Sequence, residues 1–224
     1  MKTIKIFSLK IFVLIIIIAV APSNAFPIIL CNGAGGGYGE AGGGESLIYG
    51  GSLIENYIIA GAGYYLEAYS SILSFFNRVE LAGENTRDFY QWQLILYKAI
   101  TRVNQAEAAY DLLIREAETT PYNETVLLKL KNFDYARFRV DSKLKIEIFQ
   151  EVETYLQPGD ITGVFKRIRA SLKEIHSRLK NIYEEVSLNK MPPLVSLWDL
   201  NELCSSTLLF GQYVTRVFNQ INLN

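Results

Sequence analysis

The 224-residue sequence holds one histidine and two cysteines, so few side chains can carry nucleophilic or metal chemistry. His176 would have to serve as the base for any serine or cysteine nucleophile, and no G-x-S-x-G motif accompanies it. A single histidine also fails the requirements of di-iron, bis-histidine haem and multi-histidine zinc sites. The sequence therefore predicts a non-catalytic protein without a cofactor or a metal site.

Five basic side chains recur on one face of a helix predicted over residues 161–187. They are Lys166, Arg169, Lys173, His176 and Lys180. Steps of three and four residues align them in a single stripe, called here the basic stripe. One interpretation is a track for an anionic partner such as acidic lipid, polysaccharide or an acidic protein face. The other is the solvated face of an amphipathic helix, with its charges paired to nearby acids.

Aromatic side chains are numerous, with 14 tyrosines and 12 phenylalanines. Tyr57, Tyr64, Tyr65 and Tyr69 all fall within the first predicted helix. They occupy two faces of that helix, so we expect it to contact more than one neighbour. These tyrosines indicate either a ligand pocket between helices or aromatic packing with hydroxyl groups at the rim.

The cysteines, Cys31 and Cys204, lie near the two ends of the chain. In an exported protein such a pair can form a disulfide that persists. That bond would close most of the chain into one loop, worth about 4–5 kcal/mol. The alternatives are a buried thiol, an intermolecular bond and lipid attachment at Cys31. The bulky Leu30 before Cys31 disfavours lipid attachment.

The first 25 residues have the parts of a secretory signal peptide. Lys2, Lys5 and Lys10 precede an apolar run over 11–21, and small side chains lead to a cleavage site after Ala25. The apolar run is shorter than the roughly 20 residues that a membrane span needs. We therefore expect an exported protein, in the periplasm or outside the cell, whose mature chain has no transmembrane span.

Export changes the charge as well as the location. The whole chain has a formal net charge of −1, and removal of three lysines makes the mature protein more acidic. This balance excludes a nucleic-acid partner that is bound through bulk positive charge.

Glycine fills most positions between 33 and 44, and the segment 37–42 satisfies G-x-G-x-x-G. A dinucleotide site would need a strand before this motif and a helix directly after it, within a βαβ unit. The surrounding sequence lacks that pattern. We therefore expect a flexible glycine-rich tether over residues 26–45.

From residue 46 the apolar residues recur at alternating steps of four and three, as in helices that bury one face. This period predicts helices over 45–81, 86–118, 161–187 and 196–221. The seam of the second helix is Trp92, Leu96, Ala99, Val103, Ala106, Tyr110 and Leu113, and that of the fourth is Ile161, Phe165, Ile168, Leu172, Ile175, Leu179, Ile182 and Val186. The sequence predicts an all-α, up-and-down bundle of four to five long helices over residues 46–224.

Residues 122–157 are ambiguous. Leu128 and Leu130, then Phe138 and Val140, alternate at the period of a strand, and Asp141 begins a turn-like pair. A small β-hairpin over 126–149 is one interpretation. A helix bent near Asp141 is the favoured one.

Helix ends are predicted from capping residues. Asn85 or Thr86 is expected to cap the second helix, Thr120 the third and Asp160 the fourth. Ser196 and Asp199 have the spacing of a capping box for the last helix.

The absence of an assembled catalytic set leads to three functional hypotheses. The favoured one is a binding or assembly role with a protein partner or a second copy of this chain. The second is a small-molecule sensor or carrier with a tyrosine-lined pocket of roughly 300–1,000 Å³. The third is a membrane-active helical protein that contacts the bilayer peripherally.

Overall fold

The computed structural model describes residues 52–82, 87–142 and 144–223. Their helices are α2 (Ser52–Leu81), α3 (Phe89–Thr119), α4 (Glu124–Lys131), α5 (Tyr135–Asp141), α6 (Ile146–Leu156), α7 (Ile161–Ser187) and α8 (Leu194–Leu223). These described ranges contain no β-strand, so the expected all-α class is confirmed. The predicted signal peptide, the tether and Cys31 lie outside them.

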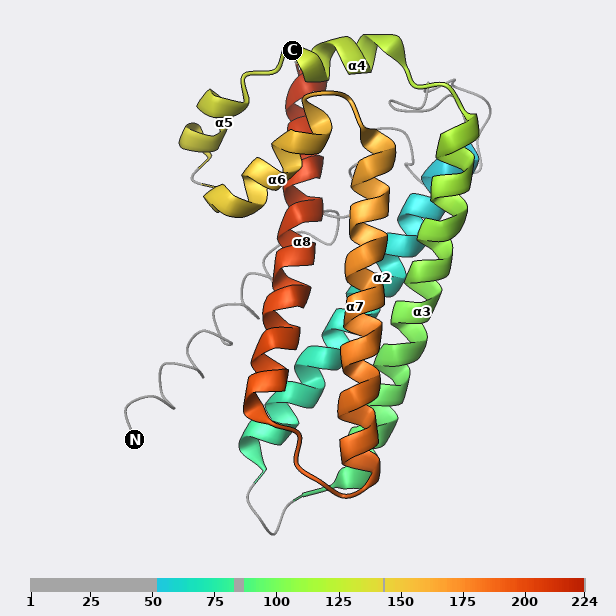
Figure 1. Cartoon of the computed structure of the whole chain (residues 1–224), viewed down its shortest axis with the longest axis vertical. Coiled ribbons are helices and arrows are strands. Elements are labelled where there is room, and N and C mark those ends of the chain that lie inside the picture. Colours follow the sequence, from blue (N-terminus) through green and yellow to red (C-terminus); the bar gives the residue numbers. More distant parts are fainter. Residues whose placement is uncertain (1–51, 83–86, 143, 224) are drawn as a thin grey trace, which may run out of the picture.

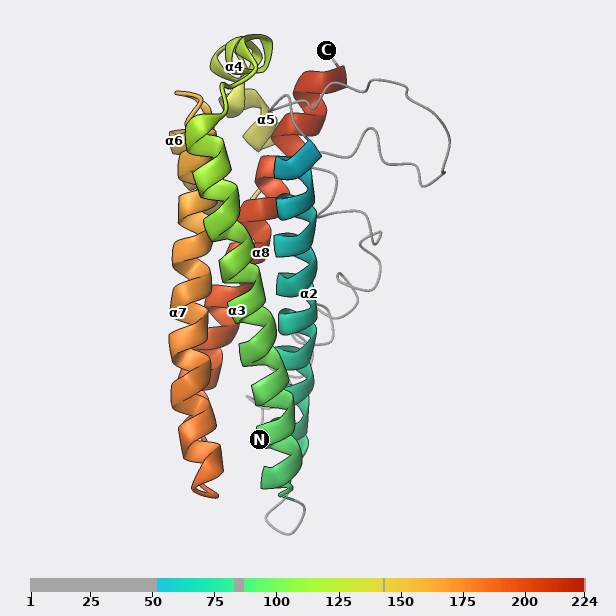
Figure 2. The ribbon, with the colours of Figure 1, turned by 90° about the vertical axis from the view of Figure 1, so that its right-hand side faces the viewer.

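Four long helices, α2, α3, α7 and α8, run side by side, and successive ones point in opposite directions (Figures 1 and 2). Helix α3 packs against both α2 and α7, and α7 packs against α8. The three short helices lie at the end of the bundle where α3 ends and α7 begins (Figure 1). There α4 crosses the end of the bundle, and α6 packs against α8.

The predicted apolar seams of α3 and α7 lie in the core. Every residue of both seams is buried. Each large apolar side chain removed from water contributes about 1.5–3 kcal/mol, so the seams fix how each helix is rotated about its own axis. That rotation also decides where the polar side chains of α7 lie.

The segment from 122 to 157 forms three short helices, so the hairpin is excluded and the single bent helix is wrong. Leu128 is 60% exposed and Leu130 is fully buried. A strand would place both on one face, whereas a helical turn separates them. Asn123 caps the start of α4 and Asp134 caps the start of α5. Each side chain accepts hydrogen bonds from backbone N–H groups of its helix. Where the sequence predicts a bend within one helix, near Asp141, helix α5 ends.

The predicted start of α7 is confirmed. The Asp160 carboxylate accepts a hydrogen bond of 2.8 Å from the backbone N–H of Gly163. Gly159 precedes it with a φ of +80°, a conformation that favours glycine over residues with a side chain. The chain can therefore end α6 and begin α7 within a few residues.

Three other cap predictions are wrong. Asp88 caps α3 in place of Asn85 or Thr86, and Thr120 ends α3 rather than beginning α4. Helix α8 starts at Leu194, directly after two prolines, so Ser196 lies inside its first turn. For α3 and α4 a nearby residue with equal capping ability, Asp88 or Asn123, is the one used, which local spacing alone does not reveal.

Within the described ranges, no helix combines the length and the apolar character that a membrane crossing requires.

Candidate functional site

Two of the four predicted pocket tyrosines are buried between α2 and α8. The Tyr65 hydroxyl donates a hydrogen bond of 2.7 Å to the backbone carbonyl of Cys204, and the Tyr69 hydroxyl lies 3.1 Å from the Ser205 hydroxyl. The two tyrosine rings are stacked, with their centres 6.3 Å apart. These side chains therefore fill the space between the helices and link them through their polar ends.

The other two, Tyr57 and Tyr64, are only partly buried. The Arg102 guanidinium lies over the Tyr64 ring, 5.7 Å from its centre, and also forms a 2.7 Å ion pair with Glu67. The four tyrosines thus occupy two different environments. The groove described below is lined by other residues.

Cys204 is fully buried on α8. Burial raises the pKa of its thiol, which keeps the thiol protonated and weakly nucleophilic. Its proposed partner, Cys31, lies outside the described residues, so the disulfide stays a prediction.

The basic stripe on α7 faces acidic residues of α3. Lys166 Nζ lies 2.7 Å from a carboxylate oxygen of Glu118, and Arg169 forms an ion pair with Asp111. The hydrogen bond to Glu118 also raises the pKa of Lys166. These contacts join the outer surfaces of two helices whose apolar seams are already packed together.

Glu107 continues this pairing along α3. Its carboxylate lies 3.8 Å from Lys173 Nζ and 3.6 Å from His176 Nδ1. Lys180, the last member of the stripe, is exposed. Four of the five stripe residues therefore have a carboxylate partner within the bundle. Binding of an external anion by the stripe stays a prediction.

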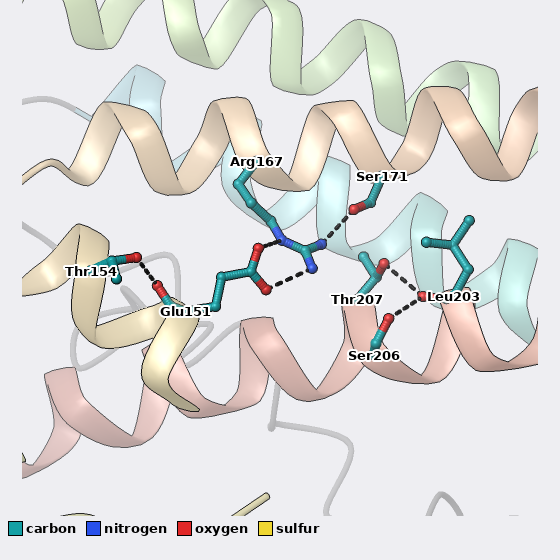
Figure 3. Close-up of polar contacts among 7 residues, drawn as sticks. All are labelled: Glu151, Thr154, Arg167, Ser171, Leu203, Ser206 and Thr207. Atoms are coloured by element: carbon teal, nitrogen blue, oxygen red, sulfur yellow. Dashed lines mark hydrogen bonds and ion pairs between the residues drawn. The ribbon is translucent and has the colours of Figure 1, made fainter. Parts of the chain in front are cut away.

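Arg167 forms a polar cluster that the sequence did not single out. Its guanidinium donates to both carboxylate oxygens of Glu151 on α6, at 2.8 and 2.9 Å, and also to the Ser171 hydroxyl (Figure 3). The guanidinium carbon lies 4.6 Å from the centre of the Phe210 ring on α8. One side chain thus holds α6, α7 and α8 together.

A groove of about 640 Å³ opens between α4, α5 and the end of α8. Helices α4 and α5 and the last turns of α8 lie together at the end of the bundle that carries the short helices (Figure 1). Its lining is Leu128, Lys129, Asn132, Phe133, Asp134, Arg137, Phe138, Asp141, Gln220 and Ile221. Apolar side chains combined with a few polar groups are typical of small-molecule sites, which range over about 300–1,000 Å³.

An aromatic cluster supports the apolar part of this groove. The ring of Phe133 contacts those of Tyr135 and Phe138, with centres 4.9 and 5.3 Å apart. Phe138 contacts Phe149 of α6, whose ring in turn meets Tyr213 of α8. Because the rings extend from the groove into the core, the groove wall is held in place before any ligand arrives.

Polar contacts fix the edges of the groove. Lys129 Nζ donates a 2.8 Å hydrogen bond to the Ile221 carbonyl, which ties α4 to the last turn of α8. The Asp134 carboxylate accepts from the Arg137 backbone N–H at 3.0 Å, and the Arg137 side chain lies 3.5 Å from Asp141. The edge is therefore charged and exposed, whereas the wall behind it is aromatic.

No protein-family model, curated protein or solved structure matches this chain. The geometry of its own residues is therefore the basis for a functional proposal. Among the described residues, no cluster of three or more histidine, cysteine or acidic side chains is arranged to hold a metal ion.

Proposed function

We propose that this chain is an exported, non-catalytic binding protein whose ligand site is the groove between α4, α5 and α8. The observation that carries the proposal is the combination of a volume of about 640 Å³ with a preformed aromatic wall and a charged edge. A groove that is already ordered loses less entropy when it binds a ligand.

The chemistry of the lining supports binding in preference to catalysis. Its carboxylates cap α5 and pair with Arg137, and its lysine bonds to the end of α8. These contacts position the groove, and the lining contains no serine, cysteine or histidine to act as a nucleophile or base.

The groove can be tested with 1-anilinonaphthalene-8-sulfonate, an aromatic anion that fluoresces in apolar sites. We expect saturable binding that Leu128→Asp weakens at least tenfold, because the new carboxylate faces the groove. Val140→Asp is the matched control, since Val140 is 72% exposed on α5 and does not line the groove. No binding, or equal loss in both variants, would contradict the proposal.

Export is a separate part of the proposal and rests on the pattern of residues 1–25. Expression of the full chain in a host with a secretory pathway should yield a protein that begins at Phe26. Intact-mass measurement of the periplasmic fraction and the medium tests this. Recovery of the uncleaved chain from the cytosol would contradict export.

A second candidate function is self-assembly through an exposed apolar cluster at the opposite end of the bundle from the groove. Leu188, Leu194, Val195 and Trp198 surround the α7–α8 connection and are 47 to 65% exposed. Exposed apolar groups of this kind mark interaction surfaces. Light scattering should then show a dimer that Leu194→Glu converts to a monomer. A monomer at all concentrations would reject self-assembly.

A further inference from the structure

The charged residues that line the groove differ between its two sides, one formed by α4 and α8 and the other by α5. On α4, the residue after it and the end of α8, the lining contains one cation, Lys129, and the amides of Asn132 and Gln220. On α5 and the residue before it, the lining contains Asp134, Arg137 and Asp141. The first set therefore has a formal charge of +1 and the second of −1.

The contacts within the protein leave each of these two groups of residues able to bind a charged ligand group. Lys129 has three N–H donors, and its bond to the Ile221 carbonyl engages one of them. Arg137 and Asp141 balance each other as an ion pair. The net negative charge of the second set is therefore carried by Asp134, which precedes α5 as its N-cap residue.

The aromatic wall lines the same groove as these charged residues. Phe133 and Phe138 are partly buried and pack against the core, so each ring can contact an apolar group of a ligand. Leu128, which is largely exposed, extends this apolar surface along α4. The groove thus combines a cation from α4, an apolar wall and an acid beside α5 in one lining.

We infer that the groove binds a short peptide with apolar side chains and free termini. The peptide carboxylate lies near Lys129, its ammonium group near Asp134, and its side chains lie against Phe133 and Phe138. A fatty acid would match the cation and the apolar wall but leave Asp134 without a partner. This inference rests on the proposed function, because it assigns a ligand class to the same groove.

Isothermal titration with the tetrapeptide Ala-Leu-Phe-Ala tests the inference. The peptide is compared in four forms: free, N-acetylated, C-amidated and blocked at both ends. Each block should weaken binding about three- to tenfold, the range expected for a charged hydrogen bond at a partly solvated edge. Equal affinity for all four forms would overturn the inference.

Two variants assign each terminus to its partner. Lys129→Gln should abolish the preference for a free carboxylate and keep the preference for a free ammonium group. Asp134→Asn should do the reverse, and because asparagine caps helices as well as aspartate does, α5 is retained. Lys131→Gln and Asp160→Asn are matched controls outside the groove lining. Equal losses for all peptide forms in Lys129→Gln would contradict the assignment.

Titration with laurate, a fatty acid, distinguishes failure of the peptide inference from failure of the proposed function. If laurate binds more tightly than the free tetrapeptide and Leu128→Asp weakens it, the groove is a binding site but the peptide inference fails. If Leu128→Asp changes neither peptide nor dye binding, the proposed function itself fails.

Discussion

The Arg167 guanidinium and the Glu151 carboxylate form a two-point ion pair, with nitrogen-to-oxygen distances of 2.8 and 2.9 Å. The pair connects α7 to the short helix α6, which packs against α8. The side chain of Arg167 is 15% exposed and that of Glu151 is 38% exposed. Loss of the acid would therefore leave a mostly buried cation without its partner.

Glu151→Gln should destabilise the fold by about 2 kcal/mol, because an unpaired buried charge costs more than the pair contributes. Glu147→Gln is the control, since Glu147 is an exposed glutamate on the same helix. Urea unfolding measures both. Equal stability of the two variants would show that the ion pair contributes little.

Alanine substitutions at Gly61 and Gly63 of α2 should change the stability of the protein in opposite directions. A Cβ at Gly61 would lie 2.9 Å from the buried Tyr110 ring, whereas nothing lies within 4 Å of a Cβ at Gly63. Gly63→Ala should therefore stabilise the protein by about 0.5–1 kcal/mol through helix propensity. Gly61→Ala should be destabilising by about 1–3 kcal/mol through overpacking. Thermal unfolding of both variants checks the signs, and a stabilising Gly61→Ala would contradict the packing.

Leu96 and Leu94 of α3 offer a matched pair for the core. Leu96 is fully buried and Leu94 is 46% exposed. Leu96→Ala should cost about 2–5 kcal/mol, because it leaves a cavity between packed helices. Leu94→Ala should cost less than about 1 kcal/mol. Similar losses in chemical denaturation would show that α3 is rotated differently from this structure.

Alkaline pH should destabilise the protein through its buried tyrosines. Burial raises the pKa of Tyr69 from 10.0 to about 12. The unfolded chain then loses the Tyr69 proton at a lower pH than the folded chain does. The contribution of this group is complete below pH 10 and is lost as the pH rises through 12, by about 2 kcal/mol at roughly pH 11.5.

Tyr69→Phe should remove that contribution to the pH dependence. The variant also loses the contact with Ser205, so we expect it to be about 1 kcal/mol less stable at pH 8. Between pH 8 and about pH 11.5, however, its unfolding free energy should fall by about 2 kcal/mol less than that of the parent protein. Tyr90→Phe, at a largely exposed site, is the control. Parallel pH profiles would contradict this role of Tyr69.

The long helices could be predicted because their signals are local. The seam from Ile161 to Val186 repeats every three to four residues, and Asp160 supplies the cap at its start. Helical period and capping depend on residues a few positions apart, so the sequence contains them directly.

The short helices were harder to predict because their local signals are weak. Leu128 and Leu130, or Phe138 and Val140, fit a strand, a long helix or two separate turns equally well. What separates these choices is contact with distant residues, such as the Lys145 backbone N–H that donates to the Tyr213 hydroxyl at 2.9 Å. Tertiary contacts override weak local preferences in such segments.

The sequence by itself determined the all-α class, the apolar seams and the scarcity of catalytic side chains, because these follow from composition and short-range spacing. Only the tertiary structure decided that the basic stripe meets acids of α3, that Arg167 binds Glu151, and that residues 128–141 and 220–221 enclose one groove. These relationships join residues far apart in the chain. Their geometry is set by how the helices pack, which no local pattern encodes.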